Sequence, residues 1–345
     1  MKLRLSASSL TCTLLCLSGS AAAQSSVSMY GVVDAGLAWE SGQHRAGHRN
    51  ALISGGNSAS RLGFRGSENL GDGWKALFVL ESGFAADDGA LTQGGLLWGR
   101  KSFVGLSAPY GTLTLGRQDS PLYDYAAEMD PLIGGLAFTR IVTLTSKYRR
   151  NNNTIKYGSP VLYGFKGQLA YSFGETAGAS ASGRVLSAGV NYTAGQSSSS
   201  LSMQTINTQP RSPAGIKTIR LINLGSRYDF GVAALSLMAQ TNKSNEGAKA
   251  LDSRDFLAGV SLPWGAHKIA ASVIVHKDRK QRGGDARQLA VSYTYALSPR
   301  TSLYGGMAHI SNRKNARFGL APLAEGGAAD GSDPTLYTAG VKHVF

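Results

Sequence analysis

One stretch of this basic chain is acidic. Asp119 to Gly135 reads DSPLYDYAAEMDPLIGG and contains no lysine or arginine, but it holds four carboxylates: Asp119, Asp124, Glu128 and Asp130. Basic residues stand on both sides of it, at Arg117, Arg140, Lys147, Arg149 and Arg150. Opposed carboxylates and arginines across a narrow aqueous gap create a field that orients and selects charged solutes. The stretch is therefore predicted to be a long loop folded into the mouth of a barrel, where it acts on ions by electrostatics.

Covalent chemistry finds little support in the sequence. No GxSxG, HExxH or Ser/His/Asp arrangement is evident. His44 and His48 stand four apart in HRAGH, but in loop-like surroundings without an acidic or cysteine ligand, and Asp87-Asp88 has no positioned partner. No catalytic residue, cofactor or metal is predicted. The alternative from another class is an outer-membrane hydrolase barrel that uses a histidine at a strand end, His276 or His309.

The first 23 residues have the pattern of a signal peptide. Lys2 and Arg4 precede an apolar run from Leu10 to Leu17, and Ala21 to Ala23 form a small-residue cleavage site. Cleavage after Ala23 is predicted to leave residues 24–345 as one transmembrane barrel domain. Both cysteines lie in the removed segment, so the mature chain has no thiol for a disulfide or a metal.

The charge balance restricts the partners. The chain carries +14, and removal of Lys2 and Arg4 with the signal leaves +12. An exported chain rarely meets nucleic acid, and the basic residues are spread over many segments. The predicted partners are therefore outer-membrane lipid and lipopolysaccharide outside, and small hydrophilic solutes and ions within.

Composition and periodicity predict an all-β fold. No mature segment has the roughly 18 consecutive apolar residues of a membrane-spanning helix. That leaves a soluble secreted β-sandwich or a closed barrel, and 44 Gly, 14 Tyr and only 10 Pro favour the barrel. Sixteen segments qualify as strands: 27–39, 60–68, 74–84, 98–106, 112–118, 147–160, 164–175, 184–194, 198–208, 216–228, 232–242, 254–264, 267–278, 287–297, 301–312 and 335–345. The prediction is a 16-stranded antiparallel transmembrane barrel, which is wide enough for an aqueous channel.

Strand parity selects residues for the lumen. In SRLGFRGSE the two arginines, Arg61 and Arg65, lie opposite the apolar pair, and Glu81 lies opposite Phe78 and Leu80. Arg150 lies opposite Ile155 and Tyr157 in the same way. Arg117 shares the parity of Leu113 and Leu115, so it reaches the lumen only if a bulge at Gly116 shifts the register.

Five motifs carry a family resemblance: MYGVVDAGL, SRLGFRGSENLGDGWKALFVLESGF, RKSFVGLSAPYGTLTLGRQ, NNTIKYGSP and the terminal AGVKHVF. In order and over the whole chain, they resemble the general trimeric porins of Gram-negative bacteria, most of all the β-proteobacterial branch. The resemblance implies a homotrimer in the outer membrane that lets small hydrophilic solutes diffuse passively. It also implies that the third loop folds into the pore and that the final Phe345 belongs to the barrel-assembly signal.

The resemblance also assigns the constriction. The family's basic cluster falls on Arg61, Arg117 and Arg150, and the acidic loop positions of enteric relatives fall on Glu128 and Leu132. Leu132 lacks the carboxylate, and Val32 stands where those relatives have a lumenal lysine. With the parity argument, the predicted constriction consists of Arg61, Arg65, Arg117, Arg150, Glu81, Asp119, Asp124, Glu128 and Asp130. The net charge and Leu132 predict weak anion selectivity, and the alternative is a porin selective for one anionic solute.

Overall fold

The computed structural model describes residues 26–44, 47–132, 149–208, 215–245, 251–280, 283–320 and 328–345. Its strands are β1 (Ser26–His44), β2 (Gly47–Ser54), β3 (Arg61–Gly71), β4 (Trp74–Gly83), β5 (Lys101–Ala108), β6 (Gly111–Asp119), β7 (Arg150–Gly158), β8 (Phe165–Ser172), β9 (Val185–Ala194), β10 (Ser197–Asn207), β11 (Thr218–Asp229), β12 (Ala234–Ser244), β13 (Asp252–Trp264), β14 (His267–Asp278), β15 (Ala286–Ala296), β16 (Thr301–Asn312) and β17 (Thr335–Val344). One helix, α1 (Pro121–Met129), follows β6. The predicted signal peptide lies outside the described residues.

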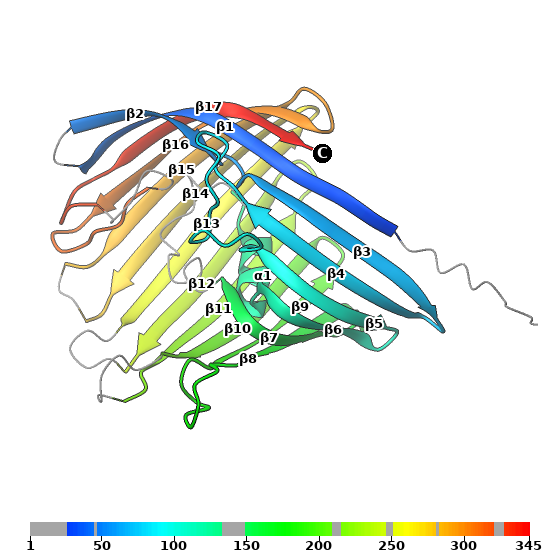
Figure 1. The fold of residues 1–345 in the computed structure, drawn as a ribbon. Coiled ribbons are helices and arrows are strands. Elements are labelled where there is room, and N and C mark those ends of the chain that lie inside the picture. The colour runs from blue at the N-terminus through cyan, green and yellow to red at the C-terminus, as the bar shows by residue number, and fades with distance from the viewer. Residues whose placement is uncertain are drawn as a thin grey trace, which may run out of the picture.

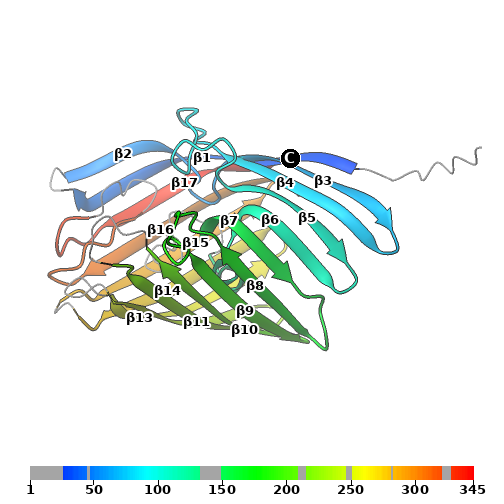
Figure 2. The same ribbon diagram turned by 60° about the horizontal axis from the view of Figure 1, so that its bottom comes forward.

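The strands form one closed antiparallel barrel. Apart from β2 and β3, each strand pairs with its neighbour in sequence, and β1 pairs with β17, so the two ends of the sheet meet (Figure 1). β2 and β3 share one place in the wall, because β1 pairs with β3 through Ser26 to Val32 and with β2 through Ala35 to Glu40. The 17 described strands minus this shared place give 16 positions, and the predicted 16-stranded barrel is confirmed. Figure 2 shows the same wall from below, with the hairpins running obliquely along it.

Alternation along each strand separates an apolar outer face from a polar lumen. On β15, Leu289, Val291 and Tyr293 point outward and are 48%, 46% and 41% exposed, whereas Gln288 and Ser292 point inward and are buried. Successive side chains of a strand lie on opposite faces, so one sequence serves lipid and water together. Short turns such as 230–233 and 265–266 lie at one end of the barrel, and the longer loops, including the one with α1, lie at the other.

Two elements differ from the sequence prediction. Residues predicted as a Gly/Asn/Ser-rich loop with His44 and His48 continue β1 and form β2 instead. The predicted long loop also contains a helix, α1. Within the described parts of the chain, no helix is long and apolar enough to cross a membrane.

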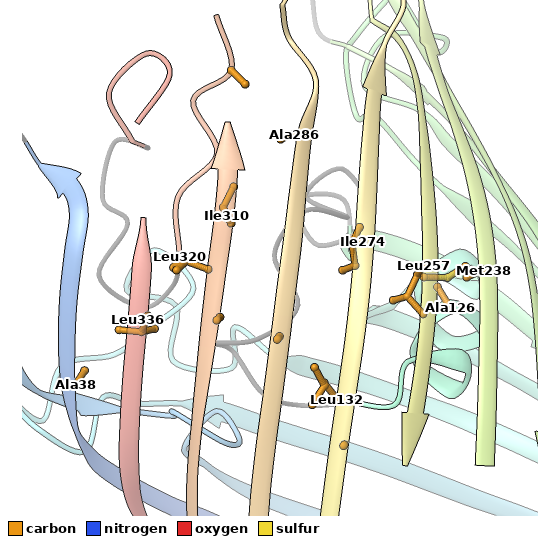
Figure 3. Close-up of a cluster of buried hydrophobic side chains, with 14 of the residues drawn as sticks. Ala38, Ala126, Leu132, Met238, Leu257, Ile274, Ala286, Ile310, Leu320 and Leu336 are labelled. Atoms are coloured by element: carbon orange, nitrogen blue, oxygen red, sulfur yellow. The ribbon is translucent and has the colours of Figure 1, made fainter. Parts of the chain in front are cut away.

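Apolar side chains also gather inside the barrel, in a cluster shown in Figure 3. Leu132 comes from the segment after α1, and Leu320 comes from the loop between β16 and β17. Both pack with inward side chains of the wall such as Ile274, Ile310 and Leu336, which are fully buried. One part of the inner wall is therefore covered by loops rather than by water.

Candidate functional site

Helix α1 places the acidic stretch against the wall. It begins at the N-cap Ser120, whose hydroxyl accepts the Tyr123 N–H at 3.2 Å, and Pro121 occupies the first turn. Its buried face packs on β9, β10 and β11 and comprises Leu122, Tyr125, Ala126 and Met129. The Tyr125 hydroxyl donates to the Lys166 carbonyl at 2.9 Å. The helix lies close because the wall has inward glycines beneath it, where a Cβ would meet Tyr125 or Met129.

Asp119 is the first centre of the site. It ends β6, is only 5% exposed, and stands opposite Arg150 in the pairing of β6 with β7. Its Oδ1 accepts a hydrogen bond from Arg149 Nε at 2.8 Å and lies 3.3 Å from Arg150 Nε. Lys101 Nζ lies 3.6 Å from the other oxygen, Oδ2. Three cations thus surround one buried carboxylate.

Glu81 is the second centre. Arg100 Nε donates to Glu81 Oε1 at 2.6 Å, and the Tyr30 hydroxyl donates to Oε2 at 2.9 Å. Arg61 Nε stays 3.9 Å from Oε2, an ion pair without a hydrogen bond. Glu81 and Lys101 are directly opposite each other in the β4–β5 ladder, which joins this centre to Asp119.

Asp124 of α1 lies beside Asp119, because both contact Lys156. Lys156 Nζ donates to Asp124 Oδ2 at 2.5 Å and to the Asp119 carbonyl at 3.1 Å. Arg149 lies over the Tyr123 ring, 3.9 Å from its centroid, a cation–π contact.

Burial raises the pKa of each carboxyl group on or just after α1. For Asp124 the Lys156 ammonium opposes the rise, and for Glu128 the nearby Lys166 does so. Burial raises the pKa of Asp130 to about 6, although the Leu132 N–H donates to its carboxylate at 2.9 Å.

We call Arg61, Arg100, Lys101, Arg149, Arg150 and Lys156 the basic cluster. Their ion-pair partners are Glu81, Asp119 and Asp124. Six positive and three negative charges leave an excess of +3 on this side of the barrel. Such an excess attracts anions and repels cations in the adjoining water.

The structure sets Arg117 apart from the basic cluster. The expected bulge is present, because the β6–β7 register shifts between Gly116 and Gln118. It does not turn Arg117 inward, since Arg117 still pairs with Ser102 on β5 and keeps the outward parity of Leu113 and Leu115. Its guanidinium donates to the Gly99 carbonyl at 2.8 Å and to the Asn152 side chain.

The other residues predicted for the constriction fall into two groups, those that the structure brings together and those that it does not. Arg61, Glu81, Asp119, Asp124 and Arg150 come together, as described above. Arg65 lies inward but farther along β3, where it donates to Ser28 at 3.2 Å and lies 5.3 Å from the centre of the Tyr30 ring. Glu128 and Asp130 are in none of the ion pairs found among the described residues.

Sequence reasoning did not select Arg100, Lys101, Arg149 or Lys156 for the site. For two of them, the position in the strand alternation could have predicted a side chain directed into the lumen. Lys101 has the parity opposite to Val104 and Leu106, and Lys156 has the parity opposite to Ile155 and Tyr157. Arg100 and Arg149 precede their strands, where parity gives no direction.

Leu132 has a structural role that its missing charge did not suggest. It is 5% exposed and belongs to the apolar cluster of Figure 3, with Ile274 and Leu257. A carboxylate at this place would be buried among apolar side chains at high cost. Leucine therefore fits this loop because it packs, and the excess of cations comes from the basic cluster.

Among the residues that the structure describes, no group of three His, Cys, Asp or Glu side chains is placed to hold a metal ion. His276 Nδ1 lies 2.6 Å from Asp255, and His309 contacts Thr335 and Ser311. In these contacts His276 has a carboxylate but no serine, and His309 has a serine but no carboxylate. Neither histidine therefore completes the arrangement that the hydrolase alternative needs.

A closed 16-position barrel with an apolar outside, a polar lumen and a charged inner cluster defines a membrane channel. Comparison with known proteins identifies the kind of membrane channel. The family model for the Gram-negative porin matches residues 7–315, and the chain belongs to this family. It is thus a channel protein of the Gram-negative outer membrane.

Individual relatives agree over nearly the full length. Outer membrane porin protein 32 of Delftia acidovorans is 34% identical, and the match covers 96% of this chain and 97% of that protein. An outer membrane porin protein of Bordetella pertussis is 29% identical over 95% of this chain and 96% of its own. The solved anion-selective porin from Comamonas acidovorans is similar with a TM-score of 0.84 and 30% identity, covering 93% of this chain and 100% of the other.

Proposed function

We propose that this porin is a passive diffusion channel that prefers small anions, and that the basic cluster and α1 form its constriction. The excess of +3 around Glu81 and Asp119 is the observation that carries the proposal. The name of the Comamonas neighbour, an anion-selective porin, agrees with it. No bond has to be made or broken, so the prediction that the chain is not an enzyme is retained.

The preference for anions follows from the fixed positive charge of the basic cluster beside the water of the lumen. Fixed cations raise the local concentration of anions and lower that of cations within about one Debye length, roughly 10 Å at 0.1 M salt. Asp119 and Glu81 hold the arginines in place by ion pairs and hydrogen bonds, so the charges do not move away from the passing ion. Oligomerisation as a homotrimer, contact with outer-membrane lipid and lipopolysaccharide, and signal cleavage after Ala23 belong to the same proposal.

The test is a reversal potential across a planar lipid bilayer with a potassium chloride gradient. The wild-type channel is expected to give the sign of a chloride-selective pore. Arg150→Gln is expected to lower the chloride preference, because it removes one charge from the basic cluster. Arg287→Gln is a matched control outside the basic cluster and should leave the potential unchanged. A cation-selective wild type would overturn the proposal.

A second candidate is a porin selective for one anionic solute. Arg150 favours it, since its side chain is 9% exposed and its Nη2 has no hydrogen-bond partner. A bidentate oxyanion would satisfy such a guanidinium. Inorganic phosphate that blocks chloride current saturably in the wild type, but not in Arg150→Gln, would support this candidate over general diffusion.

A further inference from the structure

We infer that Asp34 and Tyr304, outside the basic cluster, position Arg61 for ion selection. This inference rests on the proposed function. Asp34 lies on β1 next to the β1–β17 seam and is fully buried. Tyr304 lies on β16, one strand beyond β17, and its hydroxyl reaches across to Asp34 at 2.7 Å.

Asp34 organises the connection between β2 and β3, residues 55–60. Its Oδ2 accepts the backbone N–H of Ser58 at 2.6 Å and of Asn57 at 3.1 Å. Its backbone exchanges hydrogen bonds with the Ser60 hydroxyl, and its carbonyl accepts the Gly55 N–H at 2.9 Å. In the connection between β2 and β3, hydrogen bonds to Asp34 thus take the place of the backbone hydrogen bonds between strands.

Three glycines make room for the Tyr304 hydroxyl. A Cβ at Gly36, Gly56 or Gly340 would lie 2.7, 2.5 or 2.4 Å from that oxygen. These glycines come from β1, from the connection and from β17, and none of them has a positive φ. The close approach of Tyr304 therefore favours glycine at all three positions, and at Gly36 and Gly340 a carbonyl oxygen of the neighbouring strand leaves no room for a side chain either.

The connection in turn holds Arg61. Arg61 Nη1 donates to the Ala59 carbonyl at 3.1 Å and to the Ser58 hydroxyl at 3.4 Å. Ser58 is itself held by Asp34, and Ala59 is the next residue along the chain. The Asn57 side chain accepts a hydrogen bond from Lys342 Nζ at 3.1 Å, so a second lumenal cation is fixed by the same connection.

This arrangement keeps Arg61 from full pairing with Glu81. Arg61 Nε lies 3.9 Å from Glu81 Oε2, and that oxygen already accepts the Tyr30 hydroxyl. If residues 57–59 were released, the guanidinium could close to hydrogen-bond distance of Glu81. The net charge of the basic cluster would stay at +3, but the Arg61 cation would lie closer to Glu81, and passing ions would meet a weaker local positive field.

Tyr304→Phe tests the inference without a change of charge. It removes the hydroxyl that orients Asp34, adds no bulk, and should lower the chloride-to-potassium permeability ratio by less than about fourfold, the change that loss of a whole unit charge about 10 Å from the ion would give. Tyr337→Phe, on the exposed outer face of β17, is the matched control and should not change the ratio. Thermal unfolding followed by circular dichroism checks that both variants form a folded barrel.

Asp34→Asn distinguishes two roles of Asp34: positioning Arg61, or acting on the passing ion directly by its own charge. Removing a carboxylate raises anion preference if Asp34 acts only by its charge, whereas loss of positioning lowers it. The pathway through Arg61 is tested by combining Tyr304→Phe with Arg61→Gln, which should show no further loss beyond Arg61→Gln alone. An unchanged ratio in folded Tyr304→Phe, or a fully additive double variant, would overturn the inference. If Arg61→Gln itself left the ratio unchanged, the proposed function would fail instead.

Discussion

Replacing Asp119 by asparagine should raise anion preference and lower stability at once. Asparagine keeps the size of the side chain but removes the charge that Arg149, Arg150 and Lys101 share at 2.8, 3.3 and 3.6 Å. The basic cluster then keeps its six cations with two carboxylates, and its excess rises from +3 to +4. The two measured quantities are expected to move in opposite directions.

The magnitude follows from Coulomb's law. One added unit charge about 10 Å from a passing ion in water contributes about 0.4 kcal/mol, which raises the local chloride density about twofold and lowers that of potassium equally. The permeability ratio should therefore rise about fourfold at low salt and less at high salt, where screening is stronger. Leaving buried cations without their carboxylate should destabilise the barrel by about 3 kcal/mol.

Reversal potentials at low and high salt measure the first effect, and thermal unfolding in detergent measures the second. Asp72→Asn, in an exposed turn at the other end of the barrel, is the matched control, because asparagine tolerates its positive φ of 47°. A lower permeability ratio in a folded Asp119→Asn channel would refute the electrostatic reasoning, since removal of a negative charge would then have favoured potassium over chloride.

Two further predictions concern the segment after α1. Leu132→Ala should cost about 2 to 5 kcal/mol of stability by leaving a cavity in the apolar cluster, seen as a lower unfolding temperature, while Leu201→Ala on the outer face should not; a stable variant with altered selectivity would contradict this packing role. Asp130 has a pKa of about 6, above its ordinary value, so its contribution to stability is present below about pH 4 and is lost as the pH rises through about 6. Anion preference should therefore fall between about pH 5 and pH 7 as Asp130 ionises, and this fall should be smaller in Asp130→Asn; equal falls in both channels would exclude Asp130.

The sequence predicts the barrel well because most strands repeat the same two-residue alternation. β2 was missed because GHRNALIS does not alternate clearly. α1 was missed although it carried a signal: Ser120 and Pro121 precede apolar residues at Leu122, Tyr125 and Met129, a helical spacing. The four carboxylates of the same stretch favoured a solvated loop instead.

The site was harder to predict than the fold. Arg61, Glu81 and Arg150 could be found because parity along a strand gives the direction of a side chain. Arg100 could not, because it precedes β5 and its direction depends on Glu81 in a neighbouring strand. For Arg117 the bulge was anticipated, but the sequence does not show on which side of the bulge the change of register falls.

The seam between β1 and β17 has a consequence for how the protein is made. The backbone of Gly31 exchanges hydrogen bonds with Phe345, and β1 pairs with β17, so the ring joins the first and the last of the described strands. Until the ring closes, the first strand is an open edge that can pair with another chain. Pairing over such a sequence separation is slow. The unfolded chain must therefore be kept apart from its copies during export. Loss of the residues of β17 would leave the remaining hairpins unable to close the barrel.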